Sequence, residues 1–315
     1  MRILICSDGS KWAQKSARFA LQLFRDATHE ITILVFKQRP RDLNAAQKSM
    51  VRGTRDKEDN VGSDRSSNII KSELQDIVDE VHVDMHKEVV WQHEEGNMAN
   101  HLLNIAKDYE LVCLGGAGKG GFSRHMLGMI VDEVVMQGKG NLMVTKTSDA
   151  QCRDILITLP PEDTDDVHIA HYLGRLFQGS DAAITVNIMW SDLPHRFEGY
   201  LDAAVGQRVK RMVDEDLFPD KRNRLNSITR IISSYGLECK AAFQDYKSMS
   251  DLVDDAKPSS YDLVVVRPPA PGDGFLQQLE PNKQSLNLMR KSASNVMLLR
   301  AVPPHHTYNE ETGSY

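Results

Sequence analysis

The sequence has 315 residues, 41% of them hydrophobic and 26% charged, and this length predicts two domains in a globular protein. The net charge of −6 argues against a nucleic-acid partner, because binding to phosphate backbones needs clustered lysine and arginine. No apolar run has membrane-spanning length and the start, MRILICSDGS, lacks a signal-peptide pattern, so we expect a cytoplasmic protein without a membrane partner.

The N-terminal half reads as alternating strands and helices. Apolar strands are predicted at Arg2–Ser7 and Ile31–Phe36, with an amphipathic helix at Lys11–Phe24 between them. This spacing predicts a right-handed parallel βαβ unit. Residues 37–68 are polar and of mixed charge, which indicates a long solvated loop, with a lid as the alternative. The elements predicted next are a helix at Ser67–Val81, a strand at Glu88–Trp91, a turn at Glu94–Asn97, a helix at Met98–Lys107, a strand at Leu111–Leu114, a helix at Ser123–Gln137 and a strand at Asn141–Lys146.

Four of these strand segments recur later in the chain in the same order. They are Ile3–Ile5 at Ile155–Ile157, Ile31–Ile33 at Ile184–Val186, Tyr109–Val112 at Tyr261–Val264, and Asn141–Met143 at Asn295–Met297. The offset stays between 152 and 154 positions, which predicts an internal duplication. We expect two five-stranded α/β domains, at 1–148 and 152–302, and a mobile tail at 303–315.

A glycine-rich stretch between the fourth strand and the next helix carries the strongest functional signal. Five glycines fall within seven residues, at Gly115, Gly116, Gly118, Gly120 and Gly121. Glycine lets the backbone approach an anion, and the first turn of a helix supplies free N–H groups and a favourable dipole. The pattern predicts a phosphate-binding loop, and a plain flexible turn is the structural alternative.

Other nucleotide motifs fit this stretch poorly. Gly116, Gly118 and Gly121 have the spacing of a dinucleotide fingerprint, but they follow the fourth strand, and no acid stands at a strand end about 20 positions on. A Walker A loop is excluded, because Cys113 stands where the first glycine before Lys119 belongs.

The second copy differs where the chemistry of the first would lie. Asp8-Gly9-Ser10 corresponds to Pro160-Pro161-Glu162, and the glycine-rich stretch corresponds to Arg267-Pro268-Pro269-Ala270-Pro271. Proline removes main-chain donors and fixes φ, so no cradle of N–H groups can form there. We expect the second copy to keep the fold and lose the site, and residues 198–235 within it read as mostly helical.

The remaining reactive side chains predict neither a metal site nor dedicated catalysis. The histidine pairs His82/His86 and His168/His171 have no third ligand in register. No Ser, Cys or Lys stands with a His in a recognisable nucleophile motif. Asp8 is a candidate base, but a carboxylate between a strand and a helix more often caps the helix or anchors a ligand. The four cysteines have no CxxC spacing, and we predict buried free thiols, with Cys6, Cys113 and Cys152 in or beside strands.

These residues together resemble a tandem universal stress protein, of the adenine-nucleotide alpha-hydrolase-like superfamily. Asp8-Gly9-Ser10 end the opening strand as in that family. Its ATP-binding members carry G-x2-G-x9-G-[ST], and Gly115, Gly118 and Gly128 match the three glycines, while Met129 replaces the hydroxyl residue. The likeness covers both halves in strand order but is motif-specific only in the first. It implies two tandem Rossmann-like α/β domains, each an open parallel sheet of order 3-2-1-4-5 flanked by helices.

The resemblance also implies a site for an adenine nucleotide, AMP, ADP or ATP, in the first copy. With that strand order, Asp8 and Gly115 face one crevice at the point where the order reverses. The adenosine end would be lined by Cys6, Ser7 and Asp8, with Phe36 against the base. The ribose and phosphate side would be lined by Leu114, Gly115, Gly118, Gly128, Met129 and Ile130, with Lys119 and Arg124 near the loop. Losing the hydroxyl at Met129 should cost one hydrogen bond to a charged group, about 1.5 to 3 kcal/mol.

Two hypotheses of different classes follow for the function. The first is a regulatory module that binds an adenine nucleotide in its N-terminal domain, with the second domain as a degenerate structural partner. The second is a ligand-free interaction module in the stress response, and slow ATP hydrolysis is a third reading without an identified base. The resemblance further implies that the fifth strands, at Asn141–Lys146 and Asn295–Arg300, pair within the chain; homodimerisation stays open.

Overall fold

The structure is a computed structural model that describes residues 1–25, 29–37, 67–81, 89–95, 98–116, 123–146, 151–160, 165–188, 222–242, 252, 260–268 and 275–300. Several predictions lie outside these residues. They are the loop at 38–66, the His82 and His86 pair, the part of the glycine-rich stretch at 117–122, the helical reading of 198–221 and the tail at 303–315.

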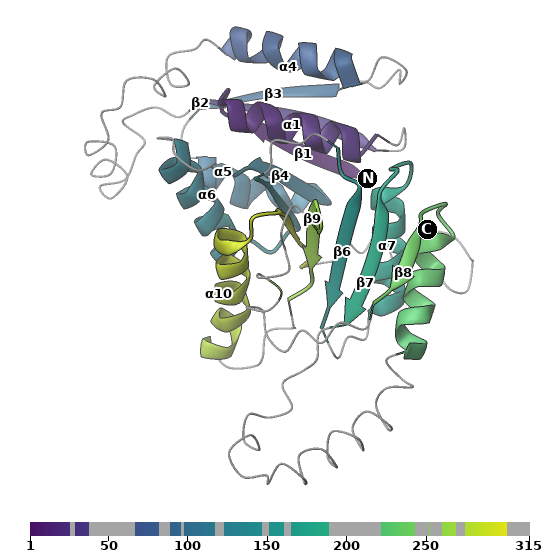
Figure 1. Cartoon of the computed structure of the whole chain (residues 1–315). Coiled ribbons are helices and arrows are strands. Elements are labelled where there is room, and N and C mark those ends of the chain that lie inside the picture. The colour runs from purple at the N-terminus through teal and green to yellow at the C-terminus, as the bar shows by residue number, and fades with distance from the viewer. Residues whose placement is uncertain are drawn as a thin grey trace.

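In the described part of the chain, ten strands form one sheet of order β3-β2-β1-β4-β5-β10-β9-β6-β7-β8 (Figure 1). The N-terminal half contributes β1 (Arg2–Ser7), β2 (Glu30–Lys37), β3 (Val89–Glu95), β4 (Leu111–Gly115) and β5 (Leu142–Thr145). The C-terminal half contributes β6 (Asp154–Leu159), β7 (Ala183–Ile188), β8 (Cys239–Ala241), β9 (Leu263–Val266) and β10 (Asn295–Leu298). Each half has the order 3-2-1-4-5 with parallel neighbours, which confirms the predicted fold class.

The two half-sheets join edge to edge through β5 and β10. These strands run antiparallel, with Met143 opposite Met297. The strand order therefore reads the same from either edge, as a twofold relation between two similar halves requires. The segments expected to meet within the chain lie side by side.

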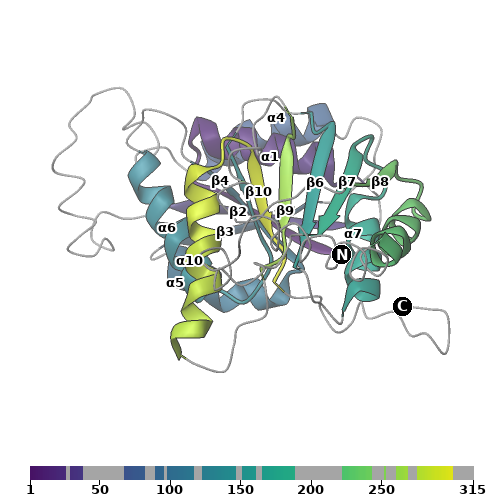
Figure 2. The same ribbon diagram turned by 60° about the horizontal axis from the view of Figure 1, so that its bottom comes forward.

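Helices cover both faces of the sheet. One face carries α1 (Lys11–Leu23), α4 (Ser67–Val81), α7 (Asp166–Phe177) and a helical segment at 222–233, all of which pack on one apolar cluster. The other face carries α5 (Met98–Ile105), α6 (Ser123–Gln137) and α10 (Phe275–Lys291), which pack on a second cluster. Figure 2 shows α6 and α10 side by side on this face. Both clusters contain residues of both halves, so the halves share their core.

The predicted bounds agree closely with those of the structure. The strand at Arg2–Ser7 and the helices at Ser67–Val81 and Ser123–Gln137 are confirmed as predicted. The start of the predicted turn at Glu94 is wrong, because β3 continues to Glu95 and pairs with the end of β2. A 3-10 turn at Ala106–Asp108 follows α5 where a continuous helix is predicted. No helix in the described part of the chain could span a membrane.

The cysteines agree with the prediction of free thiols. All four are free, with Cys6 and Cys113 buried and Cys152 and Cys239 half-buried. Burial raises the pKa of each thiol, to about 12 for Cys239. These side chains therefore act as small apolar groups in the core.

Candidate functional site

The strand order of the N-terminal half reverses between β1 and β4. The register pairs Ile3 with Leu111 and Ile5 with Cys113. Two residues further along these strands stand Ser7 and Gly115, so the Asp8 turn and the glycine-rich stretch leave the sheet at the same edge. In open α/β sheets, ligands bind outside the strand ends at such a reversal point.

The turn from β1 to α1 positions the carboxylate of Asp8. Gly9 has φ +78°, a conformation that favours glycine, and its N–H donates to Ser7 Oγ at 3.2 Å. Asp8 Oδ1 accepts from the Ser10 N–H at 3.0 Å, and Ser10 caps α1 by accepting from the Ala13 N–H at 3.2 Å. Among the described residues this half-buried carboxylate makes no other hydrogen bond.

The first two glycines of the glycine-rich stretch are required by close packing. A Cβ at Gly115 would lie 2.8 Å from the carbonyl oxygen of Trp12 and 3.0 Å from Ala13 Cα. A Cβ at Gly116 would lie 2.9 Å from the carbonyl oxygen of Thr145. These contacts are with backbone atoms, which can move only if the whole element shifts. Glycine at both positions therefore brings the start of α1 and the end of β5 against the end of β4.

Four predicted contact residues lie together in one apolar cluster. Cys6, Phe36, Leu114 and Ile130 are between 0% and 5% exposed and belong to the cluster under α5 and α6. The ring of Phe36 lies 6.5 Å from that of His101, measured between centroids. The structure thus brings these side chains together, but it packs them as core beneath the strand ends.

The remaining predicted contacts stay predictions. Gly118 and Lys119 lie outside the described residues, and so does the side chain of Met129. Gly128 and Met129 lie within α6, which begins at Ser123, directly after the glycine-rich stretch. The predicted succession of strand, glycines and helix is therefore present in the backbone on either side of 117–122.

Comparison with known proteins identifies the family of this half. Residues 1–146 match the profile of the Universal stress protein family. The N-terminal half belongs to that family. Searching the curated proteins finds no match to this sequence.

The likeness to solved structures extends over both halves. A universal stress protein from Archaeoglobus fulgidus DSM 4304 is 12% identical with a TM-score of 0.55, covering 95% of this chain and 96% of that chain. A putative universal stress protein from Pseudomonas aeruginosa UCBPP-PA14 is 11% identical with a TM-score of 0.51, covering 95% and 92%. At these identities the likeness shows the fold alone.

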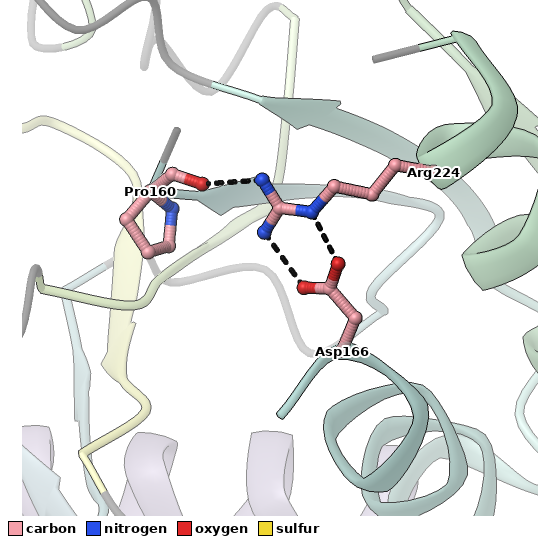
Figure 3. Close-up of polar contacts among 3 residues, drawn as sticks. All are labelled: Pro160, Asp166 and Arg224. Atoms are coloured by element: carbon pink, nitrogen blue, oxygen red, sulfur yellow. Dashed lines mark hydrogen bonds and ion pairs between the residues drawn. The ribbon is translucent and has the colours of Figure 1, made fainter. Parts of the chain in front are cut away.

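In the C-terminal half, an ion pair lies next to the strand end that corresponds to the end of β1. The Arg224 guanidinium makes a two-pronged ion pair with Asp166, with Nη2 2.7 Å from Oδ1 (Figure 3). Its Nη1 donates to the carbonyl oxygen of Pro160, directly after β6, at 3.0 Å. The two charged side chains are only 16% and 18% exposed, so this pair is largely shielded from solvent beside the end of β6.

A second arginine stands at the position equivalent to Gly115. Arg267 directly follows β9, and its Nη2 lies 3.5 Å from Asp165 Oδ2. The 152-residue offset alone points to Arg267. The segment at 222–233 lies between β7 and β8, as α4 lies between β2 and β3, but no local pattern marks the contact of Arg224 with Asp166.

The histidine pair on α7 has a structural partner. His171 Nδ1 and the Tyr235 hydroxyl are 2.9 Å apart and hydrogen-bonded. Burial, and secondarily the neighbouring His168, lowers the pKa of His171. Within the described ranges, no group of three or more His, Cys, Asp or Glu residues could hold a metal ion.

Proposed function

We propose that the N-terminal half binds an adenine nucleotide, AMP, ADP or ATP, and acts as a regulatory module without dedicated catalysis. The observation that carries this proposal is the adjacency of Asp8 and Gly115 at the reversal point of a universal stress protein half. Because Asp8 keeps one oxygen without a partner among the described residues, it suits a ribose hydroxyl or an adenine amino group. By family resemblance, the phosphates lie toward Gly118, Lys119 and Gly128.

The second half has a different role in this proposal. Arg224 and Arg267 place two guanidinium groups, each paired with an aspartate, at the ends of β6 and β9. A nucleotide there would meet these two ion pairs in place of the Asp8 turn and a glycine cradle. We therefore assign one nucleotide to each chain and a structural role to the C-terminal half, which stays joined to the first through β5 and β10.

One observation favours a ligand-free interaction module as the second candidate. Cys6, Phe36 and Leu114 are between 0% and 2% exposed, so their side chains offer no open surface to a base. Nucleotide binding then requires either contact through main-chain atoms or a shift of these side chains. In the alternative, both halves serve as scaffold for a protein partner.

Mass spectrometry of the gently purified protein tests the proposal by detecting co-purified AMP, ADP or ATP. A thermal-shift titration with each nucleotide then compares the wild type with Gly118→Asp, in which a carboxylate repels phosphate and blocks close approach. The matched control is Ile69→Asp, which adds the same charge at a side chain 50% exposed on α4. We expect stabilisation of the wild type and the control but not of Gly118→Asp. Equal stabilisation of all three would place the ligand elsewhere.

A further inference from the structure

Each half of the protein extends one cation into the other half. Lys146 follows β5, and its Nζ donates to the carbonyl oxygen of Ser292 at 2.7 Å, just beyond α10. Arg300 follows β10, and its Nη1 donates to the carbonyl oxygen of Gly138 at 2.9 Å, just beyond α6. Both cations and both carbonyls are 154 positions apart, so the two contacts are equivalent. A cation at a helix C-terminus is attracted by the free carbonyls and by the helix dipole.

Two buried asparagines complete the exchange between the halves. Asn295 Oδ1 accepts from the main-chain N–H of Lys146 at 2.7 Å, and Asn141 Oδ1 accepts from that of Arg300 at 2.8 Å. These asparagines are 0% and 3% exposed. Because leaving a buried amide unpaired is costly, each cation is fixed at its backbone as well as at its tip.

Lys146 is directly connected to the glycine-rich stretch. The preceding residue, Thr145, pairs with Gly115 and accepts from the Gly116 N–H through its carbonyl at 2.5 Å. The Thr145 hydroxyl accepts from Ser16 Oγ of α1 at 3.1 Å. A Cβ at Gly116 would lie 3.0 Å from Lys146 Cγ. The stem of Lys146 therefore lies close to the backbone of Gly116.

Arg300 holds the element on the other side of that stretch. Its guanidinium donates to the carbonyl oxygens of Val134 and Val135 as well as to that of Gly138, all at the end of α6. Since α6 begins directly after the glycine-rich stretch, both of its flanking elements, β4 with β5 and α6, are fastened to the C-terminal half.

We propose that nucleotide binding in the N-terminal half is coupled to the C-terminal half through the reciprocal caps of Lys146 and Arg300, an inference that rests on the proposed function. A ligand that holds β4 and α6 in place also stabilises the two caps. Because coupling free energies are reciprocal, a variant that destabilises the caps lowers the affinity for the ligand. The junction of α10 and β10 at Ser292–Asn295 is then where the occupied state differs from the empty one.

Calorimetry of ATP binding to Lys146→Met tests this coupling, because methionine keeps much of the apolar stem and removes the amine. The matched control is Arg290→Met, which removes an exposed ion pair with Asp132 that also joins α10 to α6. We expect about five- to tenfold weaker binding for Lys146→Met and less than about a twofold change for the control. Arg300→Lys, which keeps the charge but loses the forked geometry, should also weaken binding.

Hydrogen exchange of the wild-type protein gives a readout that needs no variant. ATP at saturation should slow the exchange of amides in 292–300, although these residues lie in the other half. ATP that binds with unchanged affinity to both cap variants, and leaves this exchange unchanged, would overturn the coupling while the proposed function stands. A wild type that binds no nucleotide would overturn both.

Discussion

Phe24 and Phe177 stack across the boundary between the two halves, with ring centroids 6.2 Å apart and an angle of 21° between the rings. They are equivalent positions 153 residues apart, at the ends of α1 and α7, and both are 0% exposed. Beside them, the imidazole Nε2 of His29 lies 3.1 Å from the carbonyl oxygen of Leu176. The halves share a core here, so we expect them to unfold together.

Phe177→Ala should therefore destabilise the whole chain and not the C-terminal half alone. Removing a fully buried ring leaves a cavity, and we expect the free energy of unfolding to fall by about 3 to 5 kcal/mol. Ile69→Ala, at a side chain 50% exposed, should change it by less than about 1 kcal/mol. Urea unfolding followed by circular dichroism measures both. Two separate transitions, or a loss as small as that of the control, would contradict the shared core.

Gly115→Ala should disturb the candidate site through the backbone. The new Cβ would lie 2.8 Å from the carbonyl oxygen of Trp12, so α1 has to shift, at a cost of about 1 to 3 kcal/mol. Gly140→Ala is the control, because its Cβ would first meet the carbonyl oxygen of Ala106 at 3.4 Å. Thermal unfolding and ATP titration should show lower stability and weaker binding for Gly115→Ala. Equal stability and equal ATP affinity of the two variants would show that α1 shifts at no measurable cost.

Lys146 makes part of the stability dependent on pH. Burial lowers the pKa of its ammonium to about 8, whereas an unfolded lysine titrates near about 10.4. Between these values the unfolded state binds more protons, so the contribution of this side chain rises with pH there and is constant below. The unfolding free energy of wild type minus that of Lys146→Met should increase by on the order of 2 kcal/mol from pH 8 to pH 10.4.

The comparison with Lys146→Met isolates this effect from the cysteines. Burial raises the pKa of their thiols, so their contribution to stability falls as pH rises through the pKa of an unfolded thiol. Both proteins carry the same cysteines, so the contribution of the thiols cancels when the two free energies of unfolding are subtracted. A difference that stays flat across the window would mean that the Lys146 ammonium is solvated.

Met129→Ser should tighten nucleotide binding if the family register holds. The serine hydroxyl would restore one hydrogen bond to a charged group, about 1.5 to 3 kcal/mol or about ten- to a hundredfold in affinity. Met129→Leu keeps an apolar side chain of similar volume and should leave the affinity unchanged. ATP titration of the wild type and both variants measures these affinities. Equal affinities would count against the register from Gly115 to Gly128.

Hydrophobic patterning was enough to predict most of the fold. Strands such as Arg2–Ser7 are continuous apolar runs because parallel strands are buried on both faces. The duplication supplied the second half without separate reasoning. The position of β8 was not predicted, because Cys239–Ala241 is three residues long and has no apolar alternation. The end of β3 was not predicted, because the polar residues Glu94 and Glu95 extend the strand by pairing with β2.

The candidate site was less predictable, because its packing depends on tertiary contacts that local sequence patterns do not reveal. The glycine count alone does not distinguish Gly115 and Gly116, which α1 and β5 require, from glycines kept for a ligand. The burial of Phe36 and Leu114 follows from how α5 and α6 cover the sheet. The contact of Arg224 with Asp166 joins residues 58 positions apart, which only the tertiary structure brings together.

Calorimetric titration of the full-length protein with ATP, ADP and AMP tests the central claim most directly. We predict saturable binding of one nucleotide per chain, at the strand ends next to Asp8 and Gly115, because the equivalent strand ends of the other half carry the ion pairs of Arg224 and Arg267. Two nucleotides per chain would contradict the assignment of a structural role to the C-terminal half. Neither heat nor thermal stabilisation with any of the three at millimolar concentration would contradict nucleotide binding itself.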